Sequence, residues 1–182
     1  MGVQNQLDRA IFAGGCFWCM EPPNEGVKGV KKVTSGYIGG ETDDPTYEEV
    51  CSGATGHAEA VEIVFDPKEI SYAELLDIFW RNIDPTTRDQ QFVDVGTQYR
   101  SGIFYLSDEQ KRLAEESKKK LAASGKFGRP IVTEVTKASK FYPAEQYHQG
   151  FCRLNPGHYQ RYRAGSGRDR YLDKVWGKDR EH

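Results

Sequence analysis

The stretch Ala10-Ile11-Phe12-Ala13, followed by Gly14-Gly15-Cys16-Phe17-Trp18-Cys19, decides how this chain begins to fold. The apolar run predicts a buried strand, and the two glycines allow a sharp turn into a helix that starts at or near Cys16. A cysteine at a helix N-terminus faces unpaired backbone N–H groups and the positive end of the helix dipole. We therefore expect the pKa of Cys16 to lie below the reference of roughly 8.5.

The prolines that follow limit this first helix. Pro22 and Pro23 each lack an N–H and clash with the preceding turn, so the helix either breaks after one turn or kinks. Cys16 and Cys19 admit three interpretations: buried apolar side chains, half of a zinc site, or a redox pair. The spacing, the Gly-Gly turn and the aromatic residues between the thiols favour the redox pair. A thioredoxin-like motif is disfavoured, because Phe17 and Trp18 stand where that motif has Gly-Pro.

Further along the chain, apolar patterns and capping boxes predict the remaining elements. The expected strands are Arg9–Ala13, Gly29–Tyr37, Ala58–Phe65, Gly102–Leu106 and Ile131–Thr136. Helices are expected after the boxes at Ser71–Glu74 and Ser107–Gln110, and over Ala144–Leu154. This order predicts an α+β fold of one domain over residues 1–182, with helices on one face of a small mixed sheet. Residues 1–7 are expected to form a loose N-terminus, and residues 164–182 a tail that wraps the surface with little regular structure.

The predicted strand Ala58–Phe65 carries a candidate general acid. Side chains alternate along a strand, so Glu59 shares a face with Val61, Ile63 and Phe65, whereas Glu62 points the other way. Burial on an apolar face raises the pKa of a carboxyl and keeps it protonated near neutral pH. The alternative is that Glu59 lies at the strand end and simply reaches water.

Composition narrows the class of protein. The chain has 182 residues, a formal net charge of −2 and 22 aromatic residues, which suits one soluble domain with no basic surface for nucleic acid. Met1–Arg9 is polar and no apolar run is long enough to span a membrane, so we expect a cytoplasmic protein. Four cysteines in such a chain are more often free or catalytic than paired in a structural disulfide. The histidines are too scattered to indicate a metal site.

Taken together, several segments resemble the peptide methionine sulfoxide reductase A family. These segments are Gly14–Trp18, Ser35–Gly40, Pro45–Cys51, Thr55–Glu59, Phe79-Trp80, Asp84–Thr86, Asp94–Ser101, Phe141–Glu145 and Tyr147–Gln149. So many motifs in one order, across most of residues 8–176, make the resemblance specific.

The resemblance implies a fold, a reaction and a site. The fold would be a two-layer α+β sandwich with a ferredoxin-like core and an irregular C-terminal stretch. The reaction would be reduction of methionine-S-sulfoxide, free or in proteins, with no metal or organic cofactor and with thioredoxin as the reductant. The resemblance implies Cys16 as the nucleophile and Glu59 as the general acid. Tyr47 and Tyr99 would hydrogen-bond the sulfoxide oxygen, with Asp94 as a supporting carboxylate. Phe17 and Trp18 would form the pocket for the S-methyl group.

This sequence departs from the family pattern in its tail. Many members carry a resolving cysteine after an Asn-Pro pair, but no cysteine follows Cys152 here. We expect Cys19, three residues from Cys16, to resolve the sulfenic acid, with Cys152 as the alternative and an external reductant as the third possibility. Cys51 is interpreted as a buried structural thiol. Phe151 stands where some relatives have a tyrosine near the pocket, so that polar contact is missing.

Overall fold

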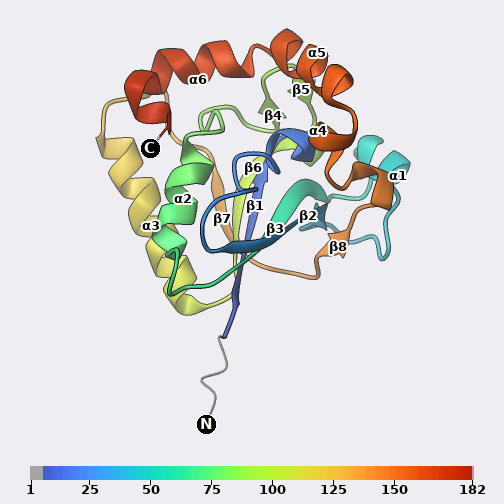
Figure 1. The fold of residues 1–182 in the computed structure, drawn as a ribbon, viewed down its shortest axis with the longest axis horizontal. Coiled ribbons are helices and arrows are strands. Elements are labelled where there is room, and N and C mark those ends of the chain that lie inside the picture. Colours follow the sequence, from blue (N-terminus) through green and yellow to red (C-terminus); the bar gives the residue numbers. More distant parts are fainter. Residues whose placement is uncertain (1–5, 182) are drawn as a thin grey trace.

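The computed structural model describes residues 6–181, which form a six-stranded mixed sheet, a separate two-stranded sheet of β4 and β5, and helices around them (Figure 1). Its strands are β1 (Asp8–Gly14), β2 (Val30–Ile38), β3 (Ala58–Phe65), β4 (Gln90–Gln91), β5 (Asp94–Val95), β6 (Ser101–Tyr105), β7 (Glu134–Lys137) and β8 (Tyr142–Pro143). Its α-helices are α1 (Tyr47–Cys51), α2 (Tyr72–Trp80), α3 (Asp108–Ala123), α4 (Phe151–Leu154), α5 (Pro156–Ser166) and α6 (Arg168–Trp176). Short 3-10 helices are η1 (Phe17–Cys19), η2 (Thr97–Tyr99), η3 (Gln146–His148) and η4 (Gly177–Glu181).

The main sheet has six strands in the order β7-β6-β1-β3-β2-β8. All neighbours pair antiparallel except β6 and β7, which are parallel. Phe12 of β1 lies opposite Val61 of β3. The end of β1 that leads to Cys16 therefore lies beside the start of β3, which carries Glu59. This register brings two residues together that are far apart in the sequence.

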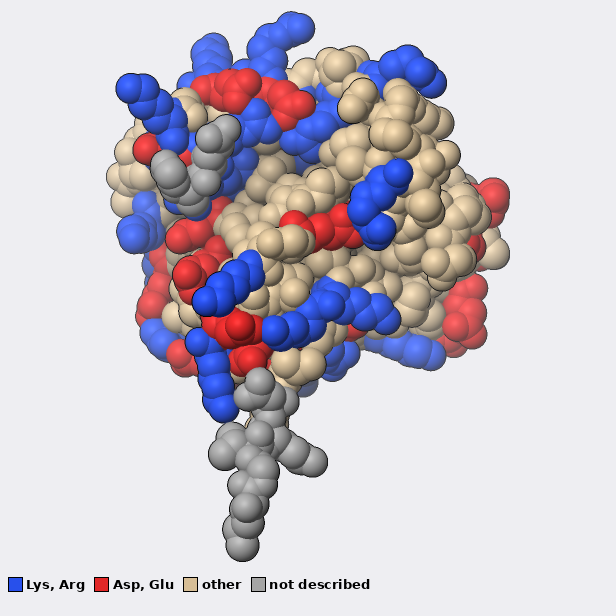
Figure 2. Space-filling view, in the orientation of Figure 1, with Lys and Arg blue, Asp and Glu red and all other residues tan. Residues whose placement is uncertain are grey.

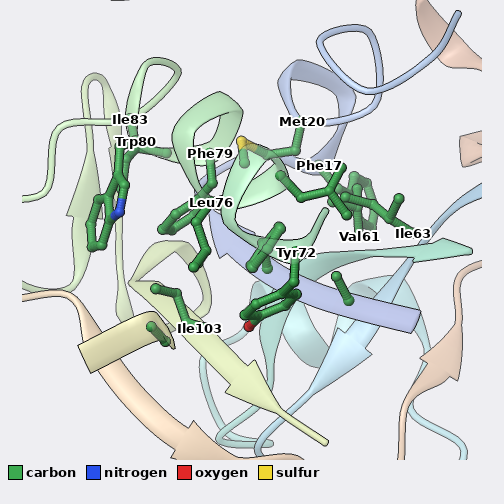
Figure 3. Close-up of a cluster of buried hydrophobic side chains, with 14 of the residues drawn as sticks. Phe17, Met20, Val61, Ile63, Tyr72, Leu76, Phe79, Trp80, Ile83 and Ile103 are labelled. Atoms are coloured by element: carbon green, nitrogen blue, oxygen red, sulfur yellow. The ribbon is translucent and has the colours of Figure 1, made fainter. Parts of the chain in front are cut away.

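The larger core lies between one face of the sheet and helices α2 and α3. Phe12 stacks on Phe79 of α2, with ring centroids 5.0 Å apart, and Val61 and Ile63 are fully buried in the same cluster (Figure 3). Burying each such side chain contributes roughly 1.5–3 kcal/mol. The opposite face has a smaller cluster: Ile11, Ala13, Ile38, Ala58, Ala60 and Phe104. Both faces of β1 and β3 are thus covered, although helices α2 and α3 pack on only one of these faces.

Several predicted elements are confirmed, since strand Ala58–Phe65 has the predicted bounds and the Ser71–Glu74 capping box opens α2. The first helix ends after one 3-10 turn, ahead of Pro22. The predicted helix Ala144–Leu154 is wrong as one element. It is divided into η3 and the short α4, because Gly150 between them adopts a left-handed conformation with φ of 63°. β7 begins three residues later than the strand predicted from Ile131.

The prediction of an irregular tail is also wrong, because residues 156–181 are helical almost throughout. Pro156 occupies the first turn of α5, where its missing N–H costs nothing. Gly167 then takes a φ of 75° and joins α5 to α6. Gly167 thus ends α5 and precedes α6, and the glycine content of the tail does not prevent helix formation. Of the loose N-terminus expected over residues 1–7, residues 1–5 lie outside the described part.

The surface carries both signs of charge. Lys and Arg side chains are interspersed with Asp and Glu on the face drawn in Figure 2 rather than gathered in one basic field. Within residues 6–181, every helix is too short or too polar to cross a membrane.

Candidate active site

Cys16 lies in the turn between β1 and η1, where it is the residue that precedes the helix. Gly15 makes this turn with a φ of 87°, and a Cβ there would lie 2.5 Å from the Gln91 side chain. Only glycine fits such a position without strain. The result is a cysteine that is 8% exposed, at the end of a strand and beside the start of β3.

The expectation of a lowered pKa at Cys16 is contradicted. Burial, and then the nearby Glu59 carboxyl, raise the pKa of the Cys16 thiol well above its ordinary value. The helix that was expected to lower it is a single 3-10 turn, and its first N–H, that of Phe17, donates to the Glu59 carboxylate at 3.1 Å. The substrate-free site therefore holds Cys16 as a thiol. Proton transfer has to accompany its attack on any electrophile.

Glu59 matches its predicted environment. It is 1% exposed, and burial raises its pKa to about 8, so it is mainly protonated at neutral pH. Glu62 lies on the other face, where it pairs with Arg9 at 3.0 Å. A protonated carboxyl beside a buried thiol provides an acid at the point where Cys16 would react.

Tyr47 and Tyr99 reach the same site from two different elements. Tyr47 begins α1 after the Thr46 cap, and Tyr99 ends η2. Burial raises the pKa of both phenols, which remain protonated hydrogen-bond donors. Burial raises the pKa of the nearby Cys51 thiol, and Tyr47 and Tyr99 oppose that rise, while the charges of Glu59 and Cys16 act on Tyr99. Cys51 is half-buried, so the expected full burial is wrong, whereas its structural role stays a prediction.

Asp94 lies on β5 with its carboxylate directed at the tail helix α5. It accepts a hydrogen bond from the Tyr162 hydroxyl, a residue that the sequence analysis did not single out. Burial raises the pKa of Asp94, while Tyr162 and the Arg168 guanidinium oppose that rise. The Asp94 charge in turn raises the pKa values of Glu59 and Cys16. Asp94 is therefore electrostatically part of the site.

An aromatic cluster forms the wall beside Cys16. Phe17 is fully buried, whereas Trp18 is half-buried and stacks on Phe151 with centroids 3.8 Å apart. The Trp18 indole N–H donates to Nδ1 of His148 at 3.2 Å, and the His148 ring lies 4.4 Å from that of Tyr47. Burial lowers the pKa of His148, which keeps the imidazole neutral. The wall is therefore largely apolar, with Trp18 as its more accessible member.

The two candidate resolving thiols belong to the same hydrophobic cluster as Trp18. Cys19 is fully buried, and its N–H donates to the Cys16 carbonyl at 3.0 Å, which closes the 3-10 turn. The thiols of Cys16 and Cys19 lie close enough for Cys19 to act on the pKa of Cys16. Cys152, on α4, is half-buried and packs against the cluster of Cys19, Phe151 and Tyr159. Both thiols thus remain near the site.

The structure places Cys16, Glu59, Asp94, Tyr47 and Tyr99 within electrostatic range of one another. Sequence reasoning missed Tyr162 and Arg168. It placed His148 in a segment that resembles the family but gave it no role, and it did not foresee Phe151 as a stacking partner. The pair Tyr159 and Tyr162, spaced three apart, is a helical signal that was available in the sequence. Across the described ranges, no three His, Cys, Asp or Glu side chains gather in a way that could hold a metal ion.

Comparison with known proteins gives consistent matches. Residues 8–180 match the family model described as peptide methionine sulfoxide reductase. The chain is 57% identical to the Bacillus subtilis (strain 168) peptide methionine sulfoxide reductase MsrA over 96% of this chain and 99% of that protein. Among solved structures, reduced Mxr1 from Saccharomyces cerevisiae superposes with a TM-score of 0.79 at 35% identity, covering 86% of this chain and 90% of that one. Mxr1 in complex with Trx2 matches with a TM-score of 0.58 at 26% identity, covering 83% and 88%.

Proposed function

Since this chain belongs to the peptide methionine sulfoxide reductase family and is a peptide-methionine (S)-S-oxide reductase, we propose that it reduces methionine-S-sulfoxide, free or in proteins, at Cys16. The observation that carries the proposal is the pairing of a buried Cys16 thiol with a Glu59 carboxyl whose pKa is about 8. One group supplies the nucleophile and the other the proton. Both are uncharged at rest, which is the state that burial favours.

The first step transfers oxygen from the substrate to the enzyme. The Cys16 sulfur attacks the sulfoxide sulfur, and Glu59 donates its proton to the sulfoxide oxygen as negative charge develops there. The phenols of Tyr47 and Tyr99 donate hydrogen bonds to the same oxygen. The proton lost by the Cys16 thiol restores Glu59. The S–S bond formed by the attack and the S–O bond of the substrate then break, as the hydroxyl group passes to the Cys16 sulfur. Cys16 is left as a sulfenic acid, oxidised by two electrons, and methionine, reduced by two, leaves the site.

The aromatic wall and Asp94 hold the substrate in our proposal. The S-methyl group would lie against Trp18, over the buried Phe17. Asp94 would act as a carboxylate that supports binding. Its charge also keeps the proton on Glu59, because a nearby like charge raises a carboxyl pKa.

The second and third steps return the enzyme to its thiol form. We propose that Cys19 attacks the sulfenic sulfur of Cys16, forms a disulfide and releases water, with Cys152 as the alternative resolving thiol. The nearness of Cys19, which acts electrostatically on the Cys16 thiol from the turn that directly follows it, supports Cys19. An external dithiol then reduces the disulfide to two thiols. Mxr1 forms a complex with Trx2, and we assign thioredoxin the same part here.

Three broader proposals accompany this function. The strand order β6-β1-β3-β2, with helices α2 and α3 on one face, supports a ferredoxin-like core in a two-layer sandwich. We treat residues 1–182 as a single catalytic domain. All four cysteines are unpaired, which supports a reducing compartment such as the cytoplasm.

The decisive experiment measures turnover of each methionine sulfoxide epimer with dithiothreitol as reductant. The S epimer should be consumed and the R epimer left intact. Turnover of neither epimer, or equal turnover of both, would disprove the proposal. Reduction of insulin disulfides, run in parallel, distinguishes a sulfoxide reductase from a general thiol-disulfide carrier.

A further inference from the structure

The C-terminal helices contribute two side chains to the surroundings of Cys16. Tyr162 of α5 donates a hydrogen bond to the Asp94 carboxylate, and its ring meets Trp18 edge-on with centroids 6.1 Å apart. Arg168 of α6 is 1% exposed and donates to the carbonyls of Gly14, at 3.1 Å, and Asn82. Figure 1 shows α5 and α6 passing over the end of the sheet at which β1 ends. Side chains of the C-terminal helices therefore form part of the surroundings of Cys16.

We propose that Tyr162 is a positioning residue, which fixes the Asp94 carboxylate beside Cys16 and so completes the active site from helix α5. This inference rests on the proposed function. Tyr162 acts through Asp94 and is not itself assigned a contact with the substrate. Its role extends the site to a segment in which the sequence indicated no function.

The geometry explains why Asp94 needs such a partner. Asp94 lies on β5, a strand of two residues that pairs only with β4 among the described strands. Its flanking residues, Val93 and Val95, are exposed. A carboxylate on so short an element is held by its hydrogen bonds more than by packing. Tyr162 supplies the side-chain bond that fixes it.

The charges around Asp94 give this bond an electrostatic consequence. The groups that face Asp94 are Tyr162 from α5, Arg168 from α6, Glu59 from β3, Tyr99 from η2 and Cys16 from the turn before η1. Tyr162 and Arg168 favour the ionised carboxylate, and burial opposes it. Loss of the Tyr162 hydroxyl should therefore raise the pKa of Asp94 further. Asp94 would then become neutral at a higher pH than in the wild-type protein.

Tyr171 provides a matched control on the neighbouring helix. Burial, and then the charge of the buried Asp84, raise the pKa of its phenol, and its ring packs on Phe92 with centroids 5.5 Å apart. Tyr171→Phe removes the same chemical group from the same tail, but at a carboxylate that does not act on Cys16. The two substitutions separate a positioning role from a general loss of tail stability.

The test compares kcat/KM for free methionine-S-sulfoxide with dithiothreitol, as a function of pH, in wild type, Tyr162→Phe and Tyr171→Phe. Misplacing a positioning group costs up to about 10²-fold, so we expect Tyr162→Phe to lower kcat/KM by roughly 10–100-fold. We also expect the acidic limb of its pH profile to move to higher pH. Tyr171→Phe should keep the wild-type profile. Unchanged kinetics in Tyr162→Phe, or equal losses in both variants, would overturn the inference.

A double-mutant cycle tests whether Tyr162 acts through Asp94. In an Asp94→Asn background, Tyr162→Phe should change kcat/KM by less than about twofold, because residues that act as one unit are not additive. A full additional loss in that background would refute the positioning role. If the wild-type protein itself failed to reduce the sulfoxide, the proposed function would fall. If the wild-type enzyme reduces the sulfoxide and Tyr162→Phe has the same kcat/KM, this inference is disproved and the proposed function stands.

Discussion

Glu59→Gln is the substitution that most directly tests the chemistry, because it removes the transferable proton and leaves the shape of the side chain almost unchanged. At pH 7, a carboxyl with a pKa of about 8 is roughly 90% protonated. A carboxyl at the ordinary value of 4.5 would be protonated in less than about 1% of molecules. Burial thus makes Glu59 an effective acid at neutral pH. General acid catalysis contributes about 10²–10⁴-fold, and we expect the variant to lose a factor in that range.

The assay is single-turnover reduction of methionine-S-sulfoxide, which measures the chemical step without the reductant. In the wild-type protein the rate should fall as pH rises above about 8, where Glu59 loses its proton. Glu59→Gln should lack this alkaline limb. Glu62→Gln is the matched control, since Glu62 lies on the opposite face of β3 and pairs with Arg9 at the surface. Equal rate losses in the two variants would refute the assignment of Glu59.

The same carboxyl predicts a stability effect with a definite sign. Glu59 keeps its proton up to about pH 8 in the folded protein but titrates near 4.5 when unfolded. The folded state therefore binds more protons between these values, and wild-type stability falls as pH rises through that window. Glu59→Gln cannot titrate. Its free energy of unfolding, relative to wild type, should increase from pH 5 to pH 8 by up to a few kcal/mol, as measured in urea. A difference that stays constant with pH would contradict the raised pKa.

Three further predictions concern the turn that holds Cys16. Cys16→Ser should abolish sulfoxide reduction, because no other thiol lies beside Glu59 in the same way; turnover near the wild-type rate would contradict this. One equivalent of sulfoxide without reductant should produce a Cys16–Cys19 disulfide, detectable by peptide mass spectrometry, and a bond from Cys16 to either of the other two thiols would rule out Cys19. Gly15→Ala should destabilise the fold by about 1–3 kcal/mol in urea, since φ is 87° and a Cβ would lie 2.5 Å from a neighbouring side chain. Gly26→Ala, with a φ of 75° but open space around the Cβ, should cost less.

The sequence by itself determined those features that depend on local order along the chain. The alternation in Ala58–Phe65 is enough to place Glu59 and Glu62 on opposite faces of the sheet, because a strand has a period of two. The Gly-Gly pair predicted the sharp turn before Cys16, and the two prolines predicted the end of the first helix. The capping box at Ser71 likewise fixed the start of α2.

Other features were decided only by the tertiary structure. The pKa of Cys16 depends on burial and on Glu59, which lies 43 residues away and reaches it through the β1–β3 register. The glycine content of the tail predicted little regular structure, but the packing of Arg168 and Leu172 stabilises helices there. The bond between Tyr162 and Asp94 joins α5 to β5 and has no local signature. Local sequence patterns set the backbone conformation and the face of the sheet or helix on which each side chain lies. The charge state, the pKa and the hydrogen-bond partner of a side chain depend on groups that only folding brings within a few ångströms.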